Sequence, residues 1–209
     1  MGKKRNHKKK NQKIINLENK RKENVLLVAD SHGRQLINTF NKFSSLNLTS
    51  IISPGATFEY VFQNLELYFN NTYSKVIIIA GTNDVDDCGF INHSFFRTHQ
   101  SLLRFCDHNP SVDVIVVTVP RRKDRVSCAV RNSNSKLNSV LYNSFGLYSV
   151  LDISRFGRQL FTRQGLHLNS AGKIELTGVL INVISAINNS KYSIFLMRNT
   201  VSSPRMCRD

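Results

Sequence analysis

A serine and a histidine in distant parts of the chain have the chemistry of a nucleophile and its base. Ser31 directly follows a short apolar run, and His167 lies in the segment Gly165-Leu166-His167-Leu168-Asn169. A serine hydroxyl is a weak nucleophile until a neighbouring base removes its proton, and an imidazole commonly does so. If the fold brings these two side chains together, they could form and hydrolyse an acyl-serine.

Two other segments could stabilise the oxyanion of such a reaction. Gly55 lies in Pro54-Gly55-Ala56-Thr57, and Asn83 lies in Gly81-Thr82-Asn83-Asp84. The backbone N–H groups of Ser31 and Gly55, with the side-chain amide of Asn83, would supply three donors. Glycine suits a donor position because, lacking Cβ, it lets the backbone approach a substrate closely.

The elements that must position these residues are visible as apolar runs and stripes. The runs, rich in β-branched residues or Leu, are residues 25–29, 48–52, 76–80, 112–118 and 147–151. Continuous apolar runs are typical of parallel strands that are covered on both faces. Between and after them lie five stripes with helical spacing: Leu36, Phe40, Phe43; Phe58, Val61, Phe62, Leu65, Phe69; Phe95, Phe96, Leu102, Leu103, Phe105; Leu137, Val140, Leu141, Phe145; and Ile174, Leu176, Val179, Leu180, Val183, Ile184.

This alternation of strands and helices predicts a doubly wound α/β domain. We expect a flavodoxin-like three-layer sandwich, with a five-stranded parallel sheet in the order 2-1-3-4-5 and helices on both faces. The aromatic stripes are interpreted as core rather than as a base-stacking platform. In such a sheet, ligands bind outside the carboxyl ends of the strands, where Ser31, Gly55, Asn83 and His167 would all lie.

Each of these residues also has a purely structural interpretation. Ser31 could be a helix N-cap, Gly55 a turn residue, and Asn83-Asp84 the cap of the next helix. Asp30 could be a carboxylate that accepts hydrogen bonds from the turn at a helix start. Their joint occurrence, in order, at successive strand ends favours the catalytic interpretation.

At this point the sequence resembles the SGNH (GDSL-type) hydrolase superfamily. Ala29-Asp30-Ser31-His32 is similar to its GDS(L) block, Gly55 to its second-block glycine, Gly81–Asp84 to its GxND block, and Gly165–Asn169 to its histidine block. The resemblance spans residues 25–185. It implies that Ser31 is nucleophile and oxyanion donor, that Gly55 and Asn83 are the other donors, and that His167 is the base. Members act on esters, lipids, thioesters or acetylated carbohydrates, generally with no metal or organic cofactor.

The sequence departs from the family pattern at two positions. Ala29 replaces the usual glycine of the first block, and Gln164 occupies the position, three before the histidine, where the family has aspartate. A triad aspartate fixes the histidine tautomer and stabilises the imidazolium. Gln164 could accept a hydrogen bond from His167 but carries no charge, so a slow Ser-His dyad is expected. Asp152 is a second candidate for orienting the histidine.

The charge of the chain is strongly positive and uneven. Its 29 Lys and Arg residues against 14 Asp and Glu give a net charge of +15, and residues 1–24 hold ten of the basic ones. We expect a basic, disordered tail over residues 1–24, an SGNH hydrolase-like domain over 25–190 and a frayed extension over 191–209. The tail is either a handle for nucleic acid or a nuclear-import signal, or only a solubilising leader.

The main alternative to an enzyme is an RNA-binding module. The resemblance admits this because the superfamily includes domains that have lost catalysis and bind RNA. The positions that would contact RNA, or an anionic group of a substrate, are Arg121, Arg122, Lys123 and Arg125. The same run could also be only a solvated loop. A structural or partner-docking domain is a third reading.

Several other features limit the compartment and the chemistry. No apolar segment of a secretory signal precedes Val25, and no run approaches the roughly 18 apolar residues of a membrane span. Four cysteines, at 88, 106, 128 and 207, lack paired or CxxC spacing and are expected to be free thiols. The scattered histidines predict no metal site. We therefore expect an intracellular protein, cytoplasmic or nuclear, acting on a small ester or acyl substrate; the oligomeric state stays open.

Overall fold

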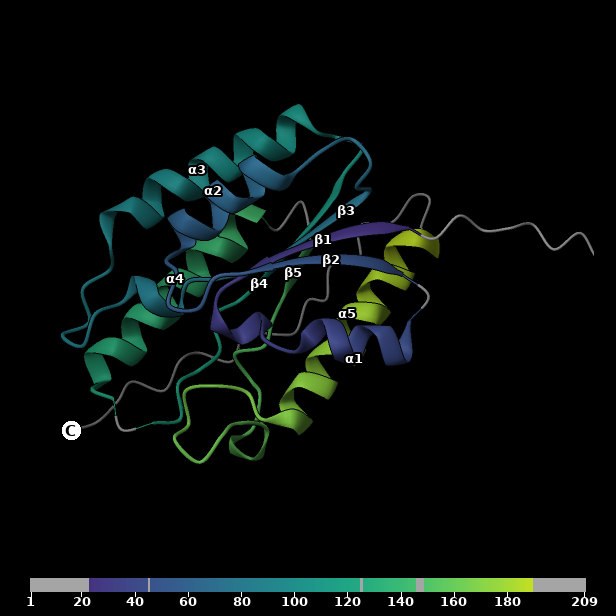
Figure 1. The fold of residues 1–209 in the computed structure, drawn as a ribbon. Coiled ribbons are helices and arrows are strands. Elements are labelled where there is room, and N and C mark those ends of the chain that lie inside the picture. The colour runs from purple at the N-terminus through teal and green to yellow at the C-terminus, as the bar shows by residue number, and fades with distance from the viewer. Residues whose placement is uncertain (1–22, 45, 125, 146–148, 190–209) are drawn as a thin grey trace, which may run out of the picture.

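A central sheet of five parallel strands organises the chain (Figure 1). The computed structural model describes residues 23–44, 46–124, 126–145 and 149–189. The strands are β1 (Asn24–Ala29), β2 (Asn47–Ile52), β3 (Lys75–Ile79), β4 (Asp113–Val117) and β5 (Ser149–Leu151). Their order is β2-β1-β3-β4-β5, which confirms the predicted doubly wound topology.

The apolar runs are continuous because both faces of each strand are covered. Along β1, Leu26 and Val28 contribute to the core on one face, whereas Val25 and Leu27 contribute to the core on the other. All four side chains are fully buried. Successive strand residues point to opposite faces, so a sheet buried on both sides needs apolar residues at every position.

Helices cover the two faces in unequal number (Figure 1). One face packs against α2 (Phe58–Tyr68), α3 (His93–His108) and α4 (Cys128–Phe145), and the other against α1 (Leu36–Phe43) and α5 (Ser170–Asn189). Three short 3-10 helices complete the domain: η1 (Ser31–Gly33), η2 (Thr82–Asp84) and η3 (Arg158–Leu160).

The predicted stripes supply most of the buried helical side chains, with two corrections. Ile174 does not belong to the core: it is 52% exposed, although Leu176, Leu180 and Ile184 of the same helix are buried. The fourth helix also begins at Cys128, well before its predicted stripe. Its first half carries only one buried apolar side chain, Val130, and therefore gives little hydrophobic signal.

Helix α5 is the one described helix that is long and apolar enough, by length and composition, to cross a membrane. The apolar residues Leu176, Leu180 and Ile184 on one of its faces pack in the core beside the sheet. This packing accounts for the composition of the helix. In Figure 1 α5 lies beside α1 against the sheet.

The two ends of the chain lie outside the described residues. The expected basic tail falls there except for Glu23 and Asn24, the latter being the first residue of β1. The expected extension over 191–209, with Cys207, falls there entirely. Among the described residues, Cys88, Cys106 and Cys128 form no disulfide.

Candidate active site

The turn after β1 places Ser31 at the carboxyl edge of the sheet. Ser31 is the first residue of η1, and the Asp30 carboxylate closes the turn by accepting a hydrogen bond from the His32 backbone N–H (2.8 Å). A Cβ at Gly33 would lie 2.5 Å from Cβ of Ala29, so only glycine fits there. The tight turn leaves the Ser31 side chain partly exposed rather than sealed in the core.

The imidazole of His167 faces this hydroxyl. Its Nδ1 lies 3.4 Å from Oγ of Ser31, across 136 residues of sequence. In the part of the chain that the structure describes, this is the only hydrogen-bonding contact of the His167 ring. The contact is at the long end of the hydrogen-bond range, as is common for catalytic pairs before a substrate binds.

The loop that carries His167 is held by its own backbone. The Thr162 N–H donates to the His167 carbonyl (2.8 Å), and the Gly165 N–H donates to the Thr162 carbonyl (2.9 Å). Gly165 has a φ of +87°, a conformation that favours glycine. The Arg158 guanidinium donates to the carbonyls of Thr162 and Arg163. These contacts fix the backbone of the loop from which the imidazole extends.

The second and third blocks are tied to each other. The Asn83 side-chain amide donates to the Ala56 carbonyl (2.9 Å), and the Asp84 carboxylate accepts from the backbone N–H of Phe58, the first residue of α2 (2.8 Å). Asp84 thus caps the preceding helix, while Asn92 caps the following one. Asn83 and the loop of Gly55 consequently form one unit at the carboxyl edge.

Several donors in these loops are left without acceptors. Within the described residues, the backbone N–H groups of Ser31 and Gly55 donate to no protein atom. The Asn83 amide has two N–H groups, and the Ala56 carbonyl uses one of them. Gly55 adopts a φ of +79°, and its Cα faces open space. The three donors expected from the sequence are therefore all available for an external acceptor.

Among the described residues, neither of the two histidine-orienting candidates forms a hydrogen bond with His167. Gln164 is exposed and, among the described residues, its side chain makes no hydrogen bond. The Asp152 carboxylate accepts from the Thr118 hydroxyl (3.2 Å) and the Ser154 backbone N–H (2.8 Å). A further hydrogen bond joins it to Tyr142.

The basic run after β4 divides into residues with different surroundings. Arg121 is exposed, whereas Arg122 forms a bidentate ion pair with Asp124. The backbone N–H of Lys123 donates to the carbonyl of Gly165 (2.9 Å), which joins this run to the loop that carries His167. Arg125 lies outside the described residues.

Three buried ionisable residues beneath the site escaped the sequence analysis as a group. Burial raises the pKa of Asp30 to about 7 and that of Asp84 to about 6, and it lowers the pKa of His32 to about 4. One carboxylate oxygen of each aspartate and both ring nitrogens of His32 are buried without a hydrogen-bond partner. The ring centroid of His32 lies 5.6 Å from that of His167. The position of His32 directly after Ser31 was the available signal.

Two cations near His167 also escaped the sequence analysis. Burial, and then the charges of Arg34 and Lys173, lower the pKa of His167 below its ordinary value. A lowered pKa keeps the imidazole neutral near pH 7, as a base must be. Arg34 lies two residues after the first block, which was a usable signal, whereas nothing in the sequence links Lys173 to Ser31. Among the described residues, no group of three His, Cys, Asp or Glu side chains could hold a metal ion.

Comparison with solved structures identifies the fold as that of GDSL-type hydrolases. A GDSL-like lipase from Bacteroides thetaiotaomicron matches with a TM-score of 0.60 at 14% identity, over 79% of this chain and 89% of the lipase. A family 3 carbohydrate esterase from Clostridium thermocellum matches with a TM-score of 0.58 at 15% identity, over 80% and 99%. A psychrotrophic esterase from Pseudoalteromonas, solved with monoethylphosphonate as inhibitor, matches with a TM-score of 0.56 at 13% identity, over 80% and 99%. No protein-family model and no curated protein sequence matches the chain.

Proposed function

We propose that the protein is a serine hydrolase that cleaves an ester or related acyl bond through an acyl-Ser31 intermediate. The observation that carries the proposal is the 3.4 Å approach of His167 Nδ1 to Ser31 Oγ at the carboxyl edge of the sheet. The solved structures that share the fold include esterases and a lipase, which supports the same reaction class.

Acylation follows from the geometry of the pair. Oγ of Ser31 attacks the carbonyl carbon of the ester while its proton passes to Nδ1 of His167. The negative charge that develops on the carbonyl oxygen is stabilised by the N–H groups of Ser31, Gly55 and Asn83. The carbon–oxygen bond to the alcohol then breaks, and the leaving alcohol takes the proton from His167.

Deacylation repeats these steps with water as the nucleophile. Neutral His167 removes a proton from water as the water oxygen attacks the acyl carbon. The same donors stabilise the second oxyanion. The bond to Oγ breaks, Oγ regains the proton from His167, and a carboxylic acid leaves.

The proposed enzyme works with a dyad, and we expect its turnover to be slow. Proton transfer to Nδ1 leaves an imidazolium whose Nε2 has no carboxylate partner among the described residues. In serine proteases, loss of the triad aspartate lowers turnover by about 10⁴. Preorganised oxyanion donors still provide a rate advantage when the triad is incomplete.

A serine-directed probe tests the proposal. The full chain should be labelled at Ser31 by a fluorophosphonate and should hydrolyse p-nitrophenyl acetate and butyrate. The Ser31→Ala protein, checked for an unchanged melting temperature, provides the background. Absence of both labelling and turnover above that background would exclude a serine hydrolase.

A second candidate is a nucleic-acid-binding module built on the same fold. It is favoured by the net charge of +15 and because no carboxylate of the described residues bonds to His167. Lysines and arginines bind phosphates independently of sequence and in a salt-dependent way. This hypothesis predicts RNA binding with a micromolar or lower Kd and a steep salt dependence. Ser31→Ala should leave the RNA affinity unchanged.

The contribution of the tail to such binding can be separated from that of the domain. In the full chain, Lys8, Lys9 and Lys10 are replaced by glutamine, and RNA affinity is measured against salt concentration. If this change removes all binding, the folded domain does not recognise RNA. If affinity instead depends on Arg121 and Lys123, the folded domain itself binds RNA.

A further inference from the structure

Two cations stand beside the Ser31–His167 pair without a carboxylate partner. Arg34 lies between η1 and α1 and is exposed, and Lys173 lies near the start of α5 and is half-buried. In the described part of the chain, neither side chain forms an ion pair within 4 Å. Both are close enough to lower the pKa of His167, after the larger effect of burial.

The fold holds Lys173 against the residue that follows Arg34. Nζ of Lys173 donates to the side-chain carbonyl of Gln35 (3.0 Å), across 138 residues. Gln35 has a φ of +64°, a left-handed conformation that is costly for a residue other than glycine. The residue next to Arg34 is thus held in a strained conformation and bonded to Lys173. Such strain is typical of functional sites rather than of ordinary surface loops.

A second group of cations lies against the loop that carries His167. Burial, followed by the charges of Arg121 and Arg158, lowers the pKa of Lys123. Arg158 also donates hydrogen bonds to carbonyls of this loop. The positive charges near His167 therefore come from the three segments that follow β1, β4 and β5.

The carboxylates described at this edge do not pair with Arg34 or Lys173. Asp124 is paired with Arg122, and the Asp152 carboxylate lies 3.9 Å from the Arg155 guanidinium. Asp30 and Asp84 are buried with a raised pKa, so part of each is protonated near neutral pH. A cluster of unpaired cations in a partly buried site attracts anions and strengthens their binding.

We propose that the ester substrate carries an anionic group, a carboxylate or a phosphate, and that Arg34 and Lys173 bind this group while Ser31 attacks the acyl carbon. The inference rests on the proposed hydrolase function and names its substrate class. The anionic group takes no part in bond making; it orients the ester at Ser31. Arg34 supplies a planar fork that matches two oxygens of either anion, and Lys173 supplies a point charge.

Three p-nitrophenyl esters of matched acyl length test the proposal on the full chain. The butyrate is neutral, the hydrogen succinate carries a carboxylate, and the 3-phosphonopropanoate carries a phosphonate in place of a phosphate. Rates are corrected with Ser31→Ala. We expect kcat/KM for at least one anionic ester to exceed that for the butyrate by about tenfold at low salt, and this advantage to shrink as NaCl is added.

Single substitutions then locate the anion site. Arg34→Gln and Lys173→Gln should each lower the ratio of anionic to neutral kcat/KM by about tenfold. Lys42→Gln is the matched control: it removes one exposed positive charge from the last turn of α1, at the opposite edge of the sheet, and should leave the ratio unchanged.

The possible failures are distinguishable. Equal turnover of all three esters, or a ratio unaffected by Arg34→Gln and Lys173→Gln, overturns the anionic substrate and leaves the hydrolase intact. Absence of turnover with every ester and of labelling at Ser31 overturns the hydrolase and the inference with it. Arg34-dependent binding of a 20-nucleotide RNA, without preference among the esters, also overturns the inference.

Discussion

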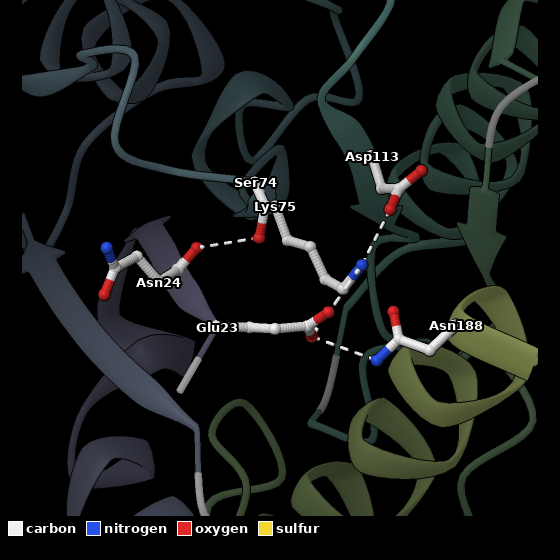
Figure 2. Close-up of polar contacts among 6 residues, drawn as sticks. All are labelled: Glu23, Asn24, Ser74, Lys75, Asp113 and Asn188. Atoms are coloured by element: carbon white, nitrogen blue, oxygen red, sulfur yellow. Dashed lines mark hydrogen bonds and ion pairs between the residues drawn. The ribbon is translucent and has the colours of Figure 1, made fainter. Parts of the chain in front are cut away.

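Buried ionisable groups have different partners at the two edges of the sheet. At the amino edge, the ammonium of Lys75, 3% exposed, lies 2.7 Å from the Asp113 carboxylate and 3.9 Å from that of Glu23, which also accepts from the Asn188 amide (Figure 2). At the carboxyl edge, Asp30, Asp84 and His32 are buried with polar atoms that have no partner. The buried charge at the amino edge is therefore compensated by its partners, whereas buried polar atoms at the carboxyl edge are not.

This difference separates what stabilises the fold from what the fold could do. At the amino edge, the buried charge of Lys75 and its partners connect β3, β4, α5 and Glu23, the residue before β1. A charge that is already paired is not available to bind a ligand. Buried groups without partners lower stability and have displaced pKa values, and such groups gather at functional sites. Substitutions at the two edges should therefore affect different measurements.

The largest expected effect is the loss of catalysis on His167→Ala. Without the base, kcat/KM for p-nitrophenyl butyrate should fall by about 10³ or more, whereas the melting temperature should change by only about 2 °C because the ring is partly exposed. Asn188→Ala, at the amino edge, serves as the control and should leave turnover unchanged. If His167→Ala kept full turnover, His167 would not be the base and the carboxyl edge would not be the catalytic edge.

Asp113→Ala should show the opposite behaviour. Removing the nearest partner of buried Lys75 should lower the free energy of unfolding by about 2 kcal/mol, because an uncompensated charge is left behind. Lys75→Met removes the charge itself and should cost less. Urea unfolding of both variants measures the difference. If Asp113→Ala proves no more damaging than Lys75→Met, the amino edge is not held together by charge.

An effect of similar size, confined to acid pH, is expected from His32→Leu. Burial lowers the pKa of His32 to about 4, whereas in the unfolded chain it is near 6.5. Between these values the unfolded state binds a proton that the folded state does not, so the imidazole costs stability as the pH falls from 6.5. His32→Leu should therefore stabilise the protein by about 2 kcal/mol more at pH 5 than at pH 7.5. Thermal melts at the two pH values test this, and an equal gain at both would contradict it.

The smallest effect concerns residue 164, in the loop that carries His167. Because His167 must be neutral and its pKa is lowered, kcat/KM should rise with pH through an apparent pKa below about 6.5. Gln164→Asp adds a negative charge to this loop and should shift that limb to higher pH while raising the plateau a few-fold. Gln63→Asp, on an exposed position of α2, is the control. If the apparent pKa of the kcat/KM profile stays unchanged, residue 164 does not interact with His167.

Much of the fold was predictable because strands that are buried on both faces are apolar at every position, and such runs are visible in the sequence. The apolar runs located all five strands and their alternation with helices predicted their order. The first half of α4 was missed because Asn134 occupies a buried position on the face of Val130 and Leu137, where the apolar stripe is interrupted. Asn138 is similar: it is buried and bonds both the N–H and the carbonyl of Val119, which no periodicity reveals.

The sequence by itself determined which chemical groups follow each strand, since Ser31, Gly55, Asn83 and His167 are specified by local motifs. Only the tertiary structure decided what those groups meet. In the folded chain, Asp152 accepts hydrogen bonds from Thr118 and Ser154, and Gln164 is exposed. Lys173 donates to Gln35, the residue after Arg34. Such contacts join residues up to 138 positions apart, and their distances depend on how helices and loops pack on the sheet rather than on any local pattern.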